Sequence, residues 1–244
     1  MSRLNSPRIV WITGASSGIG AALASAVPYE DARLICISRR PSSVGEHLAA
    51  DLADPAAWEA VGEQFASALN ETECDEAVLL HFSGAGGPHG PAADVEPRAY
   101  ARSALLNGTC GPVLAQSFLV ACRRAAVKAT IVLCSSPAAA KPRPGFSHYG
   151  AGKGAAEYWV QSVAAEQPDG GARILGVIPF AVDTAMVREV MSLPADVQPQ
   201  LSAHFRQKAA DGELASPEQT AAEIWAVVTG DTPSGTLVPV GGAD

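Results

Sequence analysis

The fold of this chain is decided by residues 13–20, Thr-Gly-Ala-Ser-Ser-Gly-Ile-Gly. They follow the apolar run Arg8–Thr13, which has the length and composition of a buried strand, and they open an Ala-rich segment of helical composition. Glycines at such a turn let the backbone approach a ligand closely, and the helix N-terminus presents N–H groups and a positive dipole to an anion. The spacing Gly-x3-Gly-x-Gly differs from the more common Gly-x-Gly-x2-Gly. We predict a pyrophosphate-binding turn, with a plain strand-to-helix turn as the alternative.

Short apolar runs alternate with Ala-rich helical stretches along the rest of the chain, which is the pattern of a parallel sheet with crossover helices. The expected strands are Arg8–Thr13, Arg33–Ser38, His47–Leu52, Glu76–Phe82, Thr130–Cys134, Arg173–Ile178 and Thr236–Pro239. The expected helices are Gly18–Val27, Pro55–Leu69, Pro97–Arg124, His148–Glu166 and Pro217–Thr229. We expect one α/β domain over residues 1–244, of the doubly wound Rossmann type, with about seven parallel strands.

Two segments depart from this regular alternation. Only about eight residues, Arg39–Glu46, connect the second expected strand to the third. A parallel crossover usually needs a dozen or more residues and a helix, so here the helix must be missing or reduced to a turn. The polar, proline-interrupted segment Val187–Leu214 is expected to be a mobile flap and not a second domain.

The composition excludes several classes of protein. With 25 acidic and 17 basic side chains the net charge is −8 at pH 7, and such a chain repels nucleic acid backbones. Hydrophobic residues make up 48% and charged residues 17%, which excludes a disordered chain. The five cysteines form neither a disulfide nor a zinc pattern and favour a reducing compartment. No run of 18 apolar residues occurs. We expect a cytoplasmic protein that binds neither nucleic acid nor membrane.

The end of the second expected strand indicates which dinucleotide binds. NAD sites place an Asp or Glu there to hold the ribose 2′-hydroxyl. This chain has Ser38, followed by Arg39 and Arg40. Guanidinium groups bind a phosphate through paired hydrogen bonds, so the sequence favours the 2′-phosphate of NADPH. Two solvated surface arginines are the alternative.

Ser136, Tyr149 and Lys153 are the candidate catalytic residues. Tyr149 and Lys153 are four residues apart at the start of an expected helix, so both side chains project from one face. A free tyrosine has a pKa of about 10. A lysine ammonium one turn away, together with a positive nicotinamide ring, would lower the pKa of Tyr149. We expect Tyr149 to give a proton to a carbonyl oxygen that Ser136 holds, as hydride arrives at the carbon. By contrast, His81, His89 and His148 lack the spacing of metal ligands, and no metal site is expected.

On these motifs the chain resembles the classical short-chain dehydrogenase/reductase family from Arg8 to about Gly241. The family's nucleotide motif corresponds to residues 13–20, and its catalytic serine, tyrosine and lysine correspond to the three residues named above. Within the family, the Ser-Arg-Arg strand end and the segment Lys141–Lys153 are similar to sepiapterin reductases and bacterial benzil reductases.

The resemblance implies further roles. Asn107 matches the helix asparagine that anchors a water for proton relay, Asp51 with Leu52 matches the adenine contact, and Thr184 matches the contact to the nicotinamide carboxamide. The residues expected to bind the cofactor are Gly14, Ser16, Ser17, Gly18, Ile19, Gly20, Ser38, Arg39, Arg40, Asp51, Leu52, Ser83, Gly84, Ala85, Tyr149, Lys153, Pro179, Val182 and Thr184.

Two departures from the family pattern bear on the site. The family's Asn-Asn-Ala-Gly after the fourth strand is here Ser83–Gly86, so two supporting amide side chains are missing. The family's Pro-Gly after the sixth strand is Pro179-Phe180, which brings an aromatic ring near the nicotinamide. We expect Phe180 and Phe146 to flank the substrate together with Ser136 and Tyr149; a ring turned into the local core is the alternative for Phe180.

These observations predict an NADPH-dependent carbonyl reductase. The expected substrate is a small aromatic or pterin-like vicinal dicarbonyl under an apolar lid of Met191, Leu193 and Leu201. The alternatives are an NAD(P)-dependent alcohol dehydrogenase for another substrate and a module that senses the cofactor without catalysis. The helices Pro97–Arg124 and His148–Glu166 have more apolar surface than one sheet face covers, and the family pairs them across a two-fold axis. We therefore expect a homodimer or homotetramer.

Overall fold

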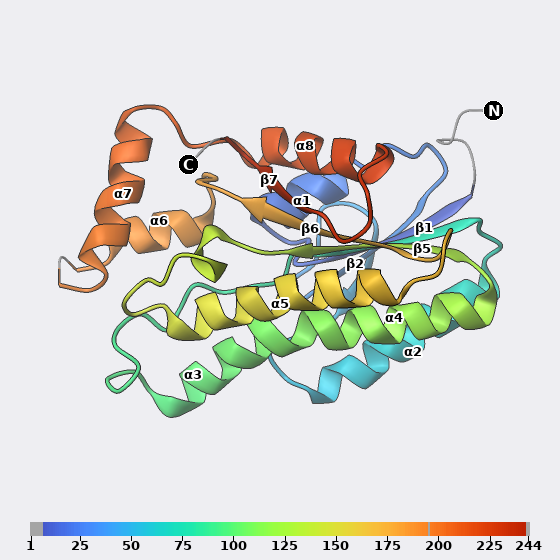
Figure 1. The fold of residues 1–244 in the computed structure, drawn as a ribbon, viewed down its shortest axis with the longest axis horizontal. Helices are drawn as coiled ribbons and strands as arrows, with labels where there is room; N and C mark the ends of the chain where they lie inside the picture. The colour runs from blue at the N-terminus through green and yellow to red at the C-terminus, as the bar shows by residue number, and fades with distance from the viewer. Residues whose placement is uncertain (1–6, 195, 243–244) are drawn as a thin grey trace.

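The computed structural model describes residues 7–194 and 196–242, in which parallel strands form one sheet between two layers of helices (Figure 1). In chain order the strands are β1 (Arg8–Thr13), β2 (Arg33–Ser38), β3 (Glu46–Ala49), β4 (Glu76–His81), β5 (Lys128–Cys134), β6 (Arg173–Pro179) and β7 (Leu237–Val240). Their order in the sheet is β3-β2-β1-β4-β5-β6-β7. This is the predicted doubly wound arrangement, with the direction of winding reversing between β1 and β4.

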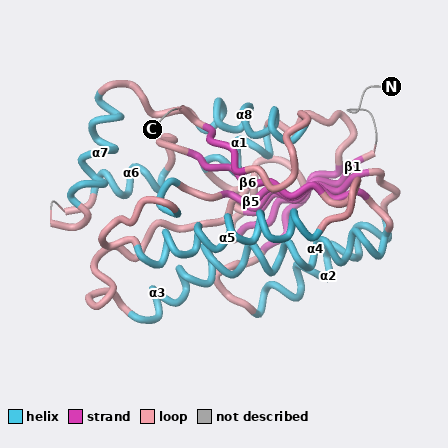
Figure 2. Tube along the Cα trace, in the orientation of Figure 1, coloured by secondary structure: helices cyan, strands magenta, loops and turns pink. Residues whose placement is uncertain are grey.

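The helices cover both faces of the sheet, as the tube in Figure 2 also shows. They are α1 (Gly18–Ser25), α2 (Ala56–Glu71), α3 (Pro97–Ala104), α4 (Cys110–Ala125), α5 (Ser147–Glu166), α6 (Ala185–Ser192), α7 (Pro199–Ala210) and α8 (Pro217–Thr229). Helices α1 and α8 lie on one face and α2, α4 and α5 on the other, while α6 and α7 extend beyond one end of the sheet (Figure 1).

The strands are continuous apolar runs because both faces of a parallel sheet are covered. All six residues of β1 are buried. On the α2–α4–α5 side, the rings of Trp11, Phe65 and Phe118 meet edge to face with centroids 5.3–5.6 Å apart. On the other side, Trp225 Nε1 donates a hydrogen bond to the carbonyl oxygen of Leu23 and ties α8 to α1. Each face thus has its own apolar core.

The structure confirms the short β2–β3 connection and corrects three expectations. No helix lies between β2 and β3, and β3 ends at Ala49, because the chain then turns so that Leu52 enters the core. The predicted flap Val187–Leu214 is largely helical, since α6 and α7 occupy most of it and bury Val190 and Leu201. The predicted helix Pro97–Arg124 contains a π-helical turn between α3 and α4.

One helix among the described residues, Pro97–Ala125, is long and apolar enough to cross a membrane by length and composition alone. The sequence analysis predicted this helix but did not identify it as a candidate span, because its apolar residues are not consecutive. In its most apolar window 44% is buried inside the protein, and the helix packs against α2 and α5. A single core helix of this kind is weak evidence for a membrane span.

Candidate active site

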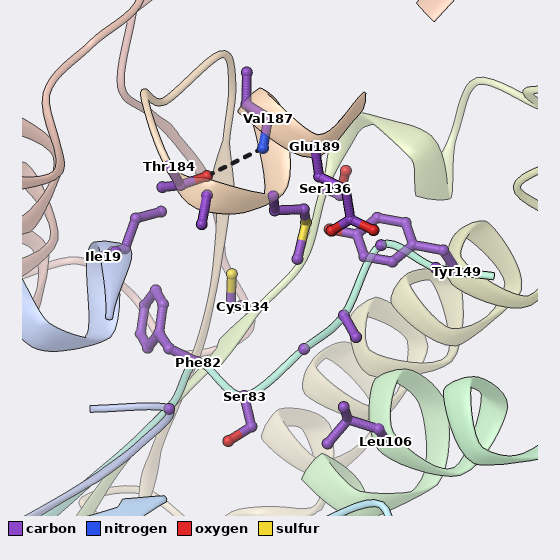
Figure 3. Close-up of a pocket in the computed structure, with 18 of the residues that line it drawn as sticks. Ile19, Phe82, Ser83, Leu106, Cys134, Ser136, Tyr149, Thr184, Val187 and Glu189 are labelled. Atoms are coloured by element: carbon purple, nitrogen blue, oxygen red, sulfur yellow. Dashed lines mark hydrogen bonds between the residues drawn. The ribbon is translucent and has the colours of Figure 1, made fainter. Parts of the chain in front are cut away.

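A cavity of about 760 Å³ lies at the carboxyl ends of the central strands, where the winding of the sheet reverses (Figure 3). Its walls come from the glycine turn after β1, the ends of β2, β4, β5 and β6, the start of α5, and helices α6 and α7. Every residue predicted to bind cofactor or substrate is among its lining residues. Asn107 alone of the predicted site residues lies behind the wall, 5% exposed.

The glycine turn has the shape of an anion site. Gly14 has a φ of +72°, and a Cβ there would lie 2.8 Å from the carbonyl oxygen of Phe82. A Cβ on Gly20 would overlap the carbonyl group of Gly14. Ser17 precedes α1 in an extended conformation, and its side chain caps no N–H group of the helix. The first-turn N–H groups are therefore available to a ligand, and the turn fits a diphosphate.

At the end of the cavity formed by the segments after β2 and β3, basic side chains surround the carboxylate of Asp51. Arg39 and Arg40 are exposed on the cavity wall after β2. Asp51 accepts hydrogen bonds from Arg102 at 2.7 Å and from the N–H of Ala53 at 3.1 Å. Burial raises the pKa of Asp51, but these bonds and the charges of Arg102 and Arg39 outweigh it and lower the pKa overall. Arg102 was missed by the sequence analysis, since nothing local to it indicates a partner 51 residues away.

The three candidate catalytic residues meet in the middle of the cavity. Ser136 follows β5, and its Oγ accepts a hydrogen bond from the N–H of Ala138 at 3.2 Å. Tyr149 and Lys153 project from the first turns of α5 and are 8% and 4% exposed. Lys153 Nζ donates to the carbonyl oxygen of Cys134 at 2.8 Å and lies 5.6 Å from the centre of the Tyr149 ring. Figure 3 shows Ser136 and Tyr149 on the same wall of the cavity.

The side chains around Tyr149 do not by themselves give the lowered pKa that we expected. Burial raises the pKa of Tyr149, and this effect outweighs the nearby ammonium of Lys153 and the hydrogen bond with Ser136, which both lower it. The expectation also counted a positive nicotinamide ring. In the protein as described, Tyr149 is protonated at neutral pH, as a proton donor must be.

Thr13 holds the backbone after β4, where the two amide side chains of the family pattern are missing. The hydroxyl of Thr13 accepts hydrogen bonds from the N–H groups of Phe82 and Ser83, both at 3.1 Å, and donates to Nδ1 of His81 at 3.0 Å. Burial lowers the pKa of His81 to about 3, so its ring is neutral and can accept. The backbone that the family supports with two asparagines is thus held by Thr13, a role the sequence analysis did not foresee.

Asn107 supports the same loop from the other side. It lies in the π-helical turn Leu105–Thr109, a feature that often marks functional positions. Its Oδ1 accepts from the N–H of Ala85 at 3.2 Å, and its Nδ2 donates to the carbonyl oxygen of Ala85 at 2.9 Å. The structure therefore places Asn107 next to the predicted cofactor loop, and both its amide oxygen and its amide nitrogen bond Ala85 of that loop.

The predicted substrate end is apolar around Tyr149 but carries charges farther out. The ring of Phe146 lies 4.6 Å from that of Tyr149, centre to centre, and Phe180 is a half-buried lining residue. Of the expected lid residues, Leu201 lines the cavity, whereas Met191 and Leu193 are absent from its walls. The residues that line it instead are Met186, Phe205, Arg143, Glu189, His204 and Lys208. Of the expected apolar lid, Leu201 therefore faces the cavity, and charged side chains share the outer wall with it.

Glu189 is the acidic side chain of this region. It descends from α6 toward Ser136 and Tyr149 in Figure 3. Its Oε1 lies 3.3 Å from Nε2 of His89, which joins α6 to the loop after β4. In residues 7–194 and 196–242, no three His, Cys, Asp or Glu side chains gather as metal ligands.

A protein-family model described as short chain dehydrogenase matches residues 8–193. The chain belongs to the short chain dehydrogenase family. The match extends from β1 through α6, so it includes the glycine turn, Ser136, Tyr149 and Lys153. As a member of this family, the protein is an oxidoreductase that uses NAD(P).

Individual relatives of this short chain dehydrogenase differ in substrate. It is 25% identical to a benzil reductase ((S)-benzoin forming) of Bacillus cereus, over 96% of this chain and 99% of the relative. It is 29% identical to a cis-4-hydroxycyclohexanecarboxylate dehydrogenase of Sinomonas cyclohexanicum, over 89% and 87%. A solved structure from Beutenbergia cavernae, with NADP bound at low occupancy, superposes with a TM-score of 0.77 at 23% identity, over 96% and 95%. The similarities support redox chemistry between a carbonyl and an alcohol.

Proposed function

We propose that this short chain dehydrogenase is an NADPH-dependent reductase of a small carbonyl compound. The observation that carries the proposal is one continuous cavity with the glycine turn and Arg39 at one end and Ser136, Tyr149 and Lys153 in the middle. A nucleotide bound along the turn reaches the catalytic side chains without any rearrangement of the fold.

The cofactor site would be formed by backbone and basic groups of this chain. The N–H groups at the start of α1 bind the pyrophosphate, and Gly14 and Gly20 keep the approach to it open. Arg39 and Arg40 bind the 2′-phosphate, while Ser38 replaces the acidic residue that would favour NAD. When bound, NADPH supplies the hydride.

The side chains of the catalytic group handle the proton. Ser136 donates a hydrogen bond to the substrate oxygen, and Tyr149 transfers its phenolic proton to that oxygen. Burial raises the pKa of Tyr149, so the phenol holds this proton before the reaction. The ammonium of Lys153 stabilises the phenolate that remains, because opposite charges attract strongly at a buried site. Asn107 holds the adjoining loop at Ala85 in place.

The proposed substrate is a neutral aromatic or pterin-like vicinal dicarbonyl. The ring of Phe146 beside Tyr149 and the half-buried Phe180 offer flat apolar surfaces to a ring of the substrate. The carboxylate of Glu189 disfavours an anion in the same space. The benzil reductase of Bacillus cereus acts, by its name, on such a diketone.

A second candidate is the oxidation of a cyclic hydroxy acid. It is favoured by Arg143, a basic side chain of the outer cavity that would attract a carboxylate, and by the similarity to the cis-4-hydroxycyclohexanecarboxylate dehydrogenase. A module that senses the cofactor without catalysis is the third alternative, and the intact Ser136, Tyr149 and Lys153 speak against it.

The test is a substrate panel assayed with both NADPH and NADH. It contains benzil, 1-phenyl-1,2-propanedione, sepiapterin, 4-oxocyclohexanecarboxylate, an aliphatic ketone and a 3-oxoacyl thioester. We expect the highest kcat/KM for an aromatic dicarbonyl with NADPH. A higher value for 4-oxocyclohexanecarboxylate would establish the second candidate, and binding of NADPH with no turnover of any compound would favour the sensor.

We also propose that residues 1–244 form a single domain and that the protein acts in the cytoplasm as a homodimer or homotetramer. Val120 on α4 is 36% exposed and Tyr158 on α5 is 74% exposed, so these two helices present apolar surface to solvent. Two copies that pair these helices would cover it. A monomeric mass in light scattering at micromolar concentration would contradict the proposed assembly.

A further inference from the structure

His148, the residue before Tyr149, uses both ring nitrogens in hydrogen bonds while only 3% exposed. Its Nε2 lies 2.7 Å from the carbonyl oxygen of Pro88, and its Nδ1 lies 2.7 Å from Oγ of Ser103. A carbonyl oxygen only accepts, so the proton of the ring is on Nε2. Burial lowers the pKa of His148, with the bond to Pro88 opposing this shift. The ring is neutral, and Nδ1 accepts the hydroxyl proton of Ser103.

The same order of donors continues into Asn107. The N–H of Ala85 fixes the position of the Asn107 Oδ1, so Nδ2 is the atom that faces Ser103. One N–H of Nδ2 bonds the carbonyl oxygen of Ala85, and the other is shared between Ser103 O and Oγ, both at 3.0 Å. Because the Ser103 proton points to His148, its Oγ presents a lone pair to Asn107. In each hydrogen bond from His148 through Ser103 to Asn107, the donor and the acceptor are therefore defined.

This chain of hydrogen bonds ends at the cavity wall beside the catalytic lysine. A Cβ on Gly84 would lie 3.0 Å from Asn107 Oδ1 and 3.8 Å from Lys153 Nζ. The side of Gly84 that a Cβ would occupy therefore faces both the amide of Asn107 and the end of the Lys153 side chain. A rotation of Asn107 would break the two hydrogen bonds that hold Ala85, the residue next to Gly84 on this wall.

We propose that His148 is a positioning residue, whose Nδ1 orients Ser103 and through it Asn107, so that the loop at Ala85 keeps its place against Lys153. It acts on catalysis only through these groups and contacts no reacting atom. The proposal rests on the proposed carbonyl reduction for its kinetic readout, but its structural readout is independent of any activity.

The kinetic test separates the two bonds of His148 by substitution. In His148→Asn, the side-chain oxygen takes the place of Nδ1 and keeps the acceptor for Ser103. In His148→Gln, the side-chain nitrogen takes the place of Nε2 and keeps only the bond to Pro88, and His148→Phe removes both bonds. We expect kcat per cofactor-binding site to fall about tenfold in the Gln and Phe variants and less than about threefold in the Asn variant. The KM for the carbonyl substrate stays within about threefold in all three.

A merely structural role predicts a different pattern, because the Asn and Gln variants each lose one bond and would be impaired alike. Ser103→Ala provides the second arm. It removes the same link, so the double variant with His148→Phe is expected to be no slower than either single variant. Equal kcat for the Asn and Phe variants, or additive effects in the double variant, would overturn the proposal.

The structural test needs no substrate. With ¹⁵N-labelled histidine, the spectrum of His148 is expected to show the neutral tautomer with its proton on Nε2. Exchange of the Ala85 amide proton with solvent is expected to accelerate in His148→Phe and Ser103→Ala, and to stay slow in His148→Asn. A proton on Nδ1, or unchanged exchange in the first two variants, contradicts the proposal whatever the enzyme reduces.

Discussion

The two ends of the cavity differ in that one is formed mainly by backbone and the other by side chains. At the nucleotide end, the surface is formed mainly by the backbone of the turn at Gly14 and Gly20 and by the first turn of α1. At the substrate end, it is formed by side chains from the loop after β4, the start of α5, α6 and α7, with Phe146 and Glu189 among them. A backbone site fits one chemical group, such as the diphosphate of the NAD(P) that the family uses, whereas the shape of a side-chain site changes with each substitution. The difference explains why the cofactor class is easier to infer than the substrate.

The largest expected effect is that of a substitution at Tyr149, between the two ends, which separates catalysis from cofactor binding. Tyr149→Phe removes the proposed proton donor and leaves the ring in place, so we expect a loss of about a thousandfold in kcat. NADPH affinity, measured by fluorescence titration, is expected to stay within about twofold. Residual turnover near that of the unchanged protein would mean that another group donates the proton.

The second prediction tests whether the nucleotide end depends on backbone contact. In Gly20→Ala the added Cβ overlaps the carbonyl group of Gly14, and the strain of about 1–3 kcal/mol falls on the turn. We expect NADPH affinity to fall about a hundredfold. The matched control is Gly154→Ala on α5, where the nearest atom to a Cβ, the carbonyl oxygen of Ala139, is 3.9 Å away and no loss is expected. Equal losses of NADPH affinity in the two variants would show that the overlap at Gly14 is not what weakens binding.

The third prediction tests the basic side chains beside that turn. Hydrogen bonds to charged groups contribute about 1.5–3 kcal/mol, so Arg39→Ala is expected to weaken NADPH binding about 10- to 150-fold. NADH affinity should change little, because it lacks the 2′-phosphate. Arg98→Ala, an exposed arginine outside the cavity, is the control. If the affinities for NADPH and NADH fall equally in Arg39→Ala, this side chain does not bind the 2′-phosphate.

The smallest expected effect is at the substrate end. Glu189→Gln removes a carboxylate that is 56% exposed, and solvent weakens its field. We expect kcat/KM for 4-oxocyclohexanecarboxylate to rise about fivefold, while the value for benzil changes less than twofold. Glu218→Gln on α8 is exposed and lies outside the cavity, so it should alter neither value. A gain with both substrates would show that Glu189 blocks the pocket by size and not by charge.

Sequence-based prediction succeeded where neighbouring residues carry the information. The bounds of β1 and β2 were predicted to the residue, since each strand is a short apolar run ended by a turn or polar residues. All the predicted cofactor and substrate residues line one cavity for a related reason, because parallel strands bring their carboxyl ends to the same edge. Their individual roles remain predictions that the variants above test.

Prediction failed where the decisive contact is distant or where packing overrides composition. The polar segment Val187–Leu214 indicated a flap, yet α6 and α7 form there because Val190 and Leu201 gain burial beside Phe146. The helix Pro97–Arg124 carries no local signal for the π-helical turn that holds Asn107. Here the tertiary environment decided the local conformation.

The sequence by itself determined the α/β fold, the glycine turn before α1 and the spacing of Tyr149 and Lys153, because glycine geometry, strand burial and helical periodicity act over a few residues. Only the tertiary structure decided which polar groups pair. Asp51 meets Arg102 across 51 positions, Ser103 meets His148 across 45, and His89 meets Glu189 across 100. A buried or confined polar group must find a partner, but the partner's place in the chain is set by the packing of the elements, which no local pattern records.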